Sequence, residues 1–434
     1  KEENMKDLLE LAELAWNGKL DLQFEHHPVH MFYSGSTEIK NNLLGIKGIA
    51  GHYTIDTGDG LVMIDAGSQL DIDTSYEEIR KWRPDTPVKA AIFTHHHVDH
   101  IFAVKHFDEE NEKRGIAPPV VYGHQLMPEH FDRYIKTNDW NTAINRRQFA
   151  IDVEHFKWPT EYRYPDITYK KEISFQCGDL TFNLHHARGE TDDHTWVHIP
   201  EEKIIAPGDL FIWAVPNGGN PQKVQRYISD WAESLDEMVK LECEIFIPGH
   251  GFPILGKDRI QLALKTTSQF LKSLEDQTLN LMNQGKSLNQ VLHEVKMPKK
   301  LMNNPWLTPI YDDPQFLIRM IWRRYGGWWD GEYDRLLPSP RKEEANAWVE
   351  LAGGIENVIL KAKEQLNNKK YSVAAHLIET AFHANSAHEE MHKIRAEIYE
   401  QFSAVQSSSM GRNILNHASL ASKKGKRDLA QTED

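Results

Sequence analysis

Four potential metal ligands directly after an apolar stretch constrain this chain more than any other feature. Residues 88–93 read Val-Lys-Ala-Ala-Ile-Phe, and residues 94–100 read Thr-His-His-His-Val-Asp-His. A short apolar run of this kind predicts a buried strand. Alternate residues of an extended segment point the same way, so His95, His97 and Asp99 would converge, and a turn into a helix would add His100.

Such crowding of imidazoles and a carboxylate is costly unless a cation lies among them. The pattern therefore predicts a divalent metal site, and two metals would use all four groups. A histidine-rich solvated loop is the alternative, because the chain contains 23 histidines. The aspartate, the fourth histidine and the preceding strand favour the metal site.

Length and composition narrow the possible classes of protein. A chain of 434 residues predicts two domains, and 40% hydrophobic with 26% charged residues is typical of globular proteins. The net charge of -14 argues against a nucleic-acid partner. No run of about 18 apolar residues occurs, which predicts no membrane span. Two cysteines predict no disulfide framework and favour a cytoplasmic location, with a removed secretory leader as the alternative.

Strand-like and helix-like segments alternate up to about residue 255 and predict an α/β sandwich. Strands are expected at 50–56, 61–65, 88–94, 119–122, 180–185, 195–199, 203–207 and 244–248, and helices near 74–82 and 229–241. Helical patterns dominate afterwards. We predict a catalytic domain over 1–256 with an insertion at about 126–170, a helical domain over 257–410 and a polar, partly disordered tail over 411–434.

The His-x-His-x-Asp-His motif resembles the signature of the metallo-β-lactamase fold superfamily. The resemblance implies an αββα sandwich and three more ligands at strand ends. The matching positions are Glu190 in Arg-Gly-Glu-Thr, Asp209 in Pro-Gly-Asp and His250 in Pro-Gly-His-Gly. It further implies two metal sites bridged by Asp209, one with His95, His97 and Glu190 and the other with Asp99, His100 and His250.

The same resemblance implies roles for carboxylates around the metals. Asp65 follows the apolar run 61–64 and would hold a metal-bound histidine through its free ring nitrogen. Asp99 and Asp209 would orient a hydroxide that bridges two divalent ions. Zinc is the expected metal, with manganese or iron as alternatives, because the ligand set contains hard carboxylates.

The second half resembles the helical dimerisation domain of alkylsulfatases, which places a glutamate where other superfamily members have a histidine. Segments that carry this resemblance are 325–332, 336–340, 350–354, 374–379, 393–401 and 412–413. It implies a homodimer formed through the helical domain. The family's typical members carry a further C-terminal sterol-carrier-like domain, and we expect none in this chain.

We predict a dinuclear-metal hydrolase that cleaves sulfate esters of alkyl chains. Candidate sulfate-binding residues are Arg188, Arg226 and Lys223. Three departures from the alkylsulfatases leave the substrate open: the family's sulfate-clamping arginine has no single match among these candidates, Asp209 stands where a glutamate is typical, and His250 lacks the usual Trp-Pro. The alternatives are hydrolysis of another ester (thioester, lactone, β-lactam or phosphodiester) and a non-catalytic assembly protein.

Overall fold

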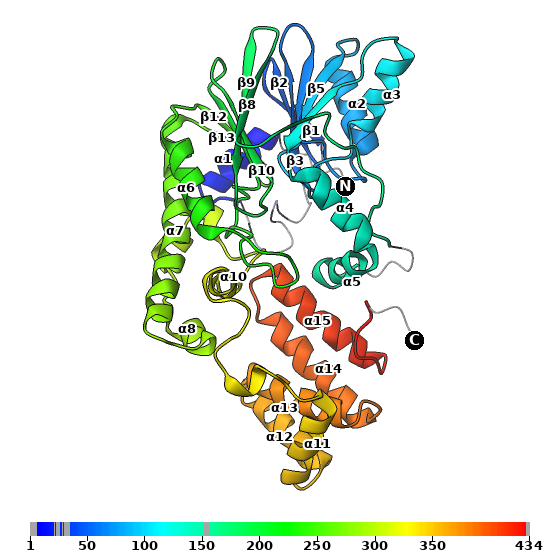
Figure 1. Ribbon diagram of the computed structural model, residues 1–434, viewed down its shortest axis with the longest axis vertical. Coiled ribbons are helices and arrows are strands. Elements are labelled where there is room, and N and C mark those ends of the chain that lie inside the picture. The colour runs from blue at the N-terminus through cyan, green and yellow to red at the C-terminus, as the bar shows by residue number, and fades with distance from the viewer. Residues whose placement is uncertain are drawn as a thin grey trace. The chain divides into compact units, whose positions relative to one another are not determined.

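The computed structural model describes residues 7–20, 22, 27, 29, 35–151 and 156–430. The chain divides into two compact units (Figure 1). The α/β unit comprises residues 1–136, 159–286 and 290–325, and the helical unit comprises residues 137–158, 287–289 and 326–434.

Two β-sheets form the centre of the α/β unit. The first sheet has the order β1-β2-β3-β4-β5-β6-β7, with β1 Gly35–Lys40, β2 Leu43–Lys47, β3 Gly51–Asp56, β4 Leu61–Ile64, β5 Val88–Ile92, β6 Val120–His124 and β7 Ile167–Tyr169. The second has the order β13-β12-β11-β10-β9-β8, with β8 Glu172–Cys177, β9 Leu180–Ala187, β10 His194–Ile199, β11 Ile204–Gly208, β12 Ile245–Pro248 and β13 Ile254–Leu255.

Side chains of both sheets share one apolar core. Ile55 and Ile92 of the first sheet lie in the same buried cluster as Phe182, Leu184 and Val197 of the second. The alternation of buried and partly buried residues along β9 shows why: one face of the strand points into this core.

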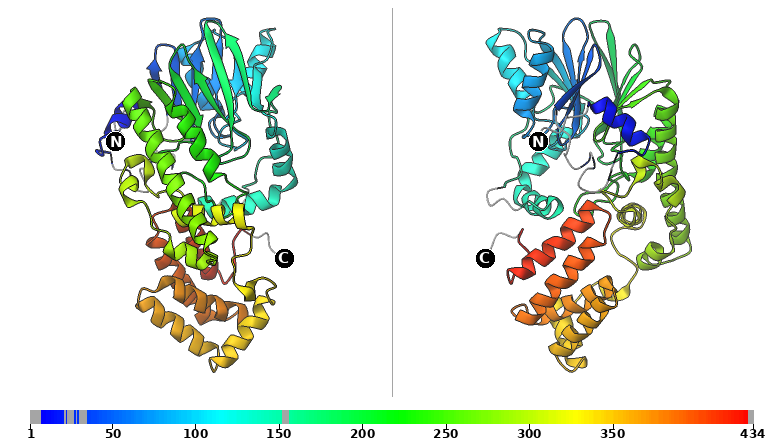
Figure 2. Two further views of the ribbon diagram at one scale, coloured as in Figure 1. Left: turned by 60° about the vertical axis from the view of Figure 1, so that its left-hand side comes forward. Right: turned by 180° about the vertical axis from the view of Figure 1, so that it is seen from behind.

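Helices cover the outer faces of both sheets (Figure 2). On the first sheet these are α2 (Ile72–Trp82), α3 (Lys105–Lys113) and α4 (Met127–Lys136), which contribute Ile79, Phe107 and Phe131 to a second apolar cluster. On the second sheet they are α6 (Ile228–Val239) and α7 (Lys257–Asn283). The predicted αββα sandwich is therefore confirmed, and each of the eight predicted strands is present.

The helical residues up to 325 group with the α/β unit, whereas the predicted boundary lay at 256. They comprise α7, most of α8 (Leu288–Glu294), α9 (Lys299–Met302) and all but the last residue of α10 (Pro314–Gly326). The physical reason is burial of α7, whose Leu264, Phe270 and Leu271 are fully covered beside α6. The remaining described α-helix of this unit is α1 (Leu8–Trp16).

The helical unit is an array of α-helices around its own core. Its described helices are α5 Asn138–Phe149, α11 Arg341–Leu351, α12 Ile355–Asn367, α13 Tyr371–Ala384, α14 Glu389–Ala404 and α15 Ser409–Lys423. The core contains Ile378, Phe382, Met391 and Ile398. The expected all-helical region is confirmed.

The expectation of an irregular polar tail is wrong for most of its length, because α15 packs against α14. The buried face of α15 is made of small side chains such as Ser419, Ala421 and Ser422. Ser419 Oγ donates to the carbonyl of Ala396 (2.8 Å), and Arg395 Nη1 donates to Ser422 Oγ (2.7 Å). A helix buried through serine and alanine leaves no hydrophobic period in the sequence.

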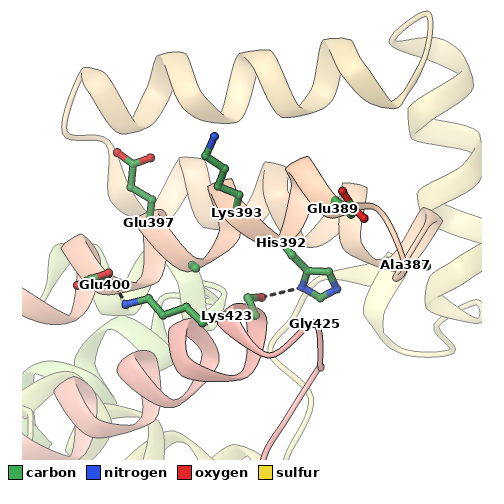
Figure 3. Close-up of a pocket in the computed structure, with 10 residues that line it drawn as sticks. Ala387, Glu389, His392, Lys393, Glu397, Glu400, Lys423 and Gly425 are labelled. Atoms are coloured by element: carbon green, nitrogen blue, oxygen red, sulfur yellow. Dashed lines mark hydrogen bonds and ion pairs between the residues drawn. The ribbon is translucent and has the colours of Figure 1, made fainter.

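A groove of about 730 Å³ lies between α14 and α15, and Figure 3 shows residues that line it. Charges of both signs surround it, and Lys423 pairs with Glu400 at 2.8 Å. No predicted site residue lines this groove. Among the residues that the structure describes, no helix is both long and apolar enough to cross a lipid bilayer.

Candidate metal centre

The predicted ligands follow the carboxyl ends of strands in both sheets. Residues 95–100 follow β5, Glu190 follows β9, Asp209 follows β11 and His250 follows β12. The main chains of the two sheets meet here, since Thr195 N donates to Thr94 O at 2.6 Å. The fold thereby brings together residues that are up to 155 positions apart in the sequence.

Asp65 fixes the start of the histidine loop from behind. It follows β4 with φ of 58°, a left-handed conformation that asparagine and aspartate tolerate better than most residues. Its carboxylate accepts hydrogen bonds from Thr94 N (2.8 Å), Thr94 Oγ1 (2.9 Å) and His100 Nδ1 (2.8 Å). His100 Nε2 is therefore left to face the other carboxylates.

His95, His97, Glu190 and Asp209 form the first ligand group. Glu190 Oε2 lies 3.7 Å from both His95 Nε2 and His97 Nδ1, and Asp209 Oδ2 lies 3.8 Å from His95 Nε2. Donors that surround one Zn²⁺ at about 2.0–2.2 Å are separated by roughly 3.3–3.6 Å. The separations quoted above and the 2.9 Å between His95 Nε2 and His97 Nδ1 lie on either side of that range, so a small adjustment of the side chains would let the four groups hold one divalent ion.

Asp99, His100 and His250 form the second group. His250 Nε2 lies 3.3 Å from Asp99 Oδ2, and His100 Nε2 lies 3.6 Å from the same oxygen. Asp209 reaches this group too, with Oδ1 at 3.4 Å from His100 Nε2 and Oδ2 at 3.3 Å from His250 Nε2. Asp209 is the carboxylate that both groups share.

Two glycines make room for Asp209. A Cβ on Gly249 would lie 2.1 Å from Asp209 Oδ1, and one on Gly208 would lie 2.7 Å from the His194 ring. Gly208 also has φ of 54°, which disfavours most side chains. The Pro-Gly-Asp and Pro-Gly-His sequences therefore allow β11 and β12, which are parallel neighbours, to present their carboxyl ends side by side.

Three buried polar atoms in these groups have no hydrogen-bond partner: His100 Nε2, Glu190 Oε2 and Asp209 Oδ1. Buried polar atoms are nearly always satisfied, so unpaired atoms that converge require an explanation. Divalent cations in the two groups would satisfy all three atoms. The residues present fit a metal centre on this ground and on the ligand spacing.

The charges in the cluster are strongly interdependent. Burial, followed by the negative charge of Asp209, raises the pKa of Glu190 to about 8. Burial alone would lower the pKa of His250, but Asp209 and Asp99 outweigh it and raise the pKa to about 9. Burial and the neighbouring His100 hold the pKa of His95 well below its usual value. Bound cations would favour the ionised form of Glu190 and the neutral form of His250, which are the forms that bind metals.

The middle histidine of the motif belongs to a different network. His96 donates to Asp193 through both Nδ1 (2.9 Å) and its backbone N (3.1 Å), and Arg133 Nη2 donates to His96 Nε2 (3.2 Å). The His130 ring packs against His96 in a tilted arrangement, with centroids 4.2 Å apart, and forms a hydrogen bond with Asp192 at 2.5 Å. These contacts hold the loop that carries His95 and His97. Sequence reasoning missed Asp193, although it follows closely after Glu190.

His194 supports the bridging carboxylate. Its Nε2 accepts a hydrogen bond from Asp209 N (3.1 Å), and its ring stacks on His95 with centroids 4.9 Å apart. His194 lies close to Glu190 in the sequence, but the sequence pattern does not assign it a specific role in the metal site. Its contacts identify it as a support for both metal groups.

One of the three candidate anion-binding residues, Arg226, contacts the cluster. Arg226 is fully buried, and its Nη1 lies 2.9 Å from Glu190 Oε1. Asn217 donates a hydrogen bond to the same oxygen, although the sequence did not single it out. Burial and the charge of Arg226 lower the pKa of Lys223 to about 7. The negative charges of Asp99 and Glu190 oppose this shift. Arg188 is not brought into this group: it pairs with Asp230 at 2.6 Å and is partly exposed.

Comparison with known proteins agrees with this site. Residues 53–250 match the model of the metallo-β-lactamase superfamily, and residues 287–425 match the model of alkyl sulfatase dimerisation. A linear primary-alkylsulfatase of Pseudomonas sp. (strain ATCC 19151) is 23% identical over 74% of this chain and 64% of its own length. An (R)-specific secondary-alkylsulfatase of Pseudomonas sp. is 23% identical over 88% of this chain and 61% of its own.

The fold is shared with a solved structure, that of the stereoselective inverting sec-alkylsulfatase Pisa1 from Pseudomonas sp.. The TM-score is 0.82 at 21% identity, over 91% of this chain and 66% of that one. The chain thus spans somewhat less than two thirds of the length of these relatives. Residues 53–250 are thus similar to the metallo-β-lactamase superfamily, and residues 287–425 are similar to the alkylsulfatase dimerisation region.

Proposed function

We propose that this chain is a hydrolase with two divalent metal ions that cleaves sulfate esters of alkyl chains. The observation that carries the proposal is the pair of ligand groups joined by Asp209, with three converging buried atoms that lack hydrogen-bond partners. The similarity to alkylsulfatases over both family regions selects sulfate esters among the substrates that such a centre can hydrolyse.

His95, His97 and Glu190 would hold one ion, Asp99, His100 and His250 the other, and Asp209 would bridge them. Zinc suits this set of imidazoles and carboxylates. Two such ions would supply Lewis acidity at the ester oxygens and lower the pKa of the attacking water.

The chain's own residues would orient the reactants. The carboxylates of Asp99 and Asp209 would accept hydrogen bonds from the attacking water. Arg226 would contact the sulfate group, since it lies beside Glu190 and carries the positive charge that an anion needs, and Lys223 is a second candidate. Sulfate is a good leaving group, so attack at carbon requires no strong general acid.

We further propose that the chain forms a homodimer through its helical unit. Large apolar side chains of this unit are more than half exposed, namely Trp140, Trp328, Tyr333, Leu337, Trp348, Leu351, Leu360 and Val405. Exposed apolar groups in this number are typical of an interface. The match of this region to a dimerisation model supports a second copy as the partner.

The proposal is tested by metal analysis together with sulfate release from dodecyl sulfate. Two divalent ions per chain and metal-dependent sulfate release are the expected results. Fewer than one ion per chain would refute the metal centre. A metal-replete protein that releases no sulfate but hydrolyses a chromogenic thioester, lactone, β-lactam or phosphodiester would assign the same centre to another substrate.

A further inference from the structure

Asp312 is a fully buried carboxylate that the chemistry above does not use. It lies just before α10, in the region that matches the dimerisation model. Its Oδ2 accepts a hydrogen bond from Gly219 N at 2.7 Å, and its Oδ1 accepts one from Asp313 N at 2.7 Å. A buried carboxylate is costly, and here it bonds main chain that is 93 residues away.

The loop that contains Gly219 packs closely against α10 and α6. A Cβ on Gly219 would lie 2.3 Å from Leu317 N, and one on Gly218 would lie 2.5 Å from Ile228 Cδ1. Val215 N donates to Thr308 O at 2.9 Å. The loop at residues 215–220 is therefore fixed along its length, with Asp312 as a side-chain anchor.

The same loop carries Asn217 to the first ligand group. Asn217 Nδ2 donates to Glu190 Oε1, which Arg226 Nη1 also approaches. With Oε1 occupied, Oε2 is the glutamate oxygen that faces His95 and His97, and it has no hydrogen-bond partner. Asn217, together with Arg226, thus leaves Oε2 as the oxygen of Glu190 that is offered to a cation.

We propose that Asp312 is a positioning residue for the first metal site. It holds the 215–220 loop through Gly219, and the loop in turn holds Asn217 on Glu190 Oε1. The inference rests on the proposed function, because it treats Glu190 as a metal ligand. It assigns part of the metal site's support to the region that matches the dimerisation model.

The neighbouring residue, Asp313, has only a local role, which is to stabilise the start of α10. Asp313 Oδ1 accepts a hydrogen bond from Gln315 N at 2.8 Å, within the first turn of α10. Asp313→Ala removes that interaction and leaves the contact between Asp312 and Gly219. It is therefore a matched control for general destabilisation of this segment.

The first measurement is hydrogen–deuterium exchange in the metal-free protein. We expect Asp312→Ala to raise exchange in peptides that cover residues 215–220 and Asp313→Ala to leave them unchanged. Unchanged protection of these peptides in Asp312→Ala would overturn the inference. Asp312→Asn retains a single acceptor, so it should give intermediate exchange and provides the same test if the alanine variant does not fold.

The second measurement is Co²⁺ titration followed by visible absorption. Loss of a group that orients a metal ligand typically weakens metal binding by about 10- to 100-fold. We expect such a loss for one of two Co²⁺ equivalents in Asp312→Ala and in Asn217→Ala, and no larger loss in the double variant. Binding of both equivalents as in the wild type would overturn the inference. Absence of Co²⁺ binding by the wild type would instead refute the proposed function, and the exchange data would still decide whether Asp312 holds the loop.

Discussion

Nδ1 of His100 lies 2.8 Å from Oδ2 of Asp65, in a buried hydrogen bond that points the other ring nitrogen at Asp99 and Asp209. The same carboxylate oxygen accepts from Thr94 Oγ1, and its partner oxygen accepts from Thr94 N. One aspartate thereby sets both the ring orientation of a ligand and the start of the histidine loop.

Asp65→Asn tests this relationship with little change in shape. Asparagine tolerates the left-handed backbone at this position, so the main chain should be preserved. One acceptor becomes a donor, and Thr94 N–H and His100 Nδ1–H cannot both be satisfied. We expect metal affinity to fall by about 10- to 100-fold, measured by competition with a chromophoric chelator. Wild-type affinity in this variant would show that Asp65 does not orient the ligand.

Removal of one ligand from each group should separate the two sites. His97→Ala and His250→Ala are each expected to lower metal content by about one ion per chain and activity by more than about 100-fold, because even changes behind the ligands have effects approaching that size. Elemental analysis measures the first effect and sulfate release the second. His106→Ala is the control, since this histidine pairs with Asp73 on the outer helices. Two ions retained in either ligand variant would contradict the assignment.

Most of the sandwich could be predicted because its central strands are continuously apolar. Strand β8 could not, because exposed and partly buried residues alternate along it and no apolar run appears. Helix α5 could not be predicted for another reason. Its buried side chains include Asn141, Asn145 and Gln148, so apolar residues do not recur at helical spacing.

The ligand positions could be proposed from strand-end motifs and a family resemblance. The residues that hold these ligands in place could not be proposed from the sequence, because each acts through a contact between segments that are distant in the sequence. Arg133 reaches His96 across 37 residues, and Asp312 reaches Gly219 across 93. A single polar residue that acts across such a distance leaves no local sequence motif from which its role could be predicted. Arg188 illustrates the converse, since its place beside Gly189 and Glu190 suggested a role that its pairing with Asp230 does not support.

Arg226 provides a test of anion binding. Arg226→Ala is expected to lower kcat/KM for an alkyl sulfate by about 10- to 100-fold, which corresponds to the about 1.5–3 kcal/mol of a hydrogen bond to a charged group. Arg226→Lys should recover part of this loss, because the charge remains while the two-pronged donor is lost. Steady-state kinetics with metal content measured in parallel separates substrate binding from metal loss. Arg188→Ala is the matched arginine control, and an equal loss there would contradict the assignment.

The exposed apolar residues of the helical unit predict a dimer that one charge can disrupt. Leu351 is 78% exposed in the single chain. Leu351→Glu would bury an unpaired carboxylate if this residue lies in the interface, so a shift from dimer to monomer is expected in light scattering. Leu70→Glu is the control, because Leu70 is 77% exposed but lies in the α/β unit. A wild-type protein that is monomeric at micromolar concentration would refute the dimer.

Removal of the metals should destabilise the α/β unit. Without ions, His100 Nε2, Glu190 Oε2 and Asp209 Oδ1 stay buried without hydrogen-bond partners, and like-charged carboxylates face one another. A ligand that binds only the folded state at 100 times its Kd stabilises that state by about 2.7 kcal/mol. We therefore expect a chelator to lower Tm in the wild type, and zinc to restore it. His97→Ala should respond less, since it retains one site, and an equal response in both proteins would mean that the chelator acts elsewhere.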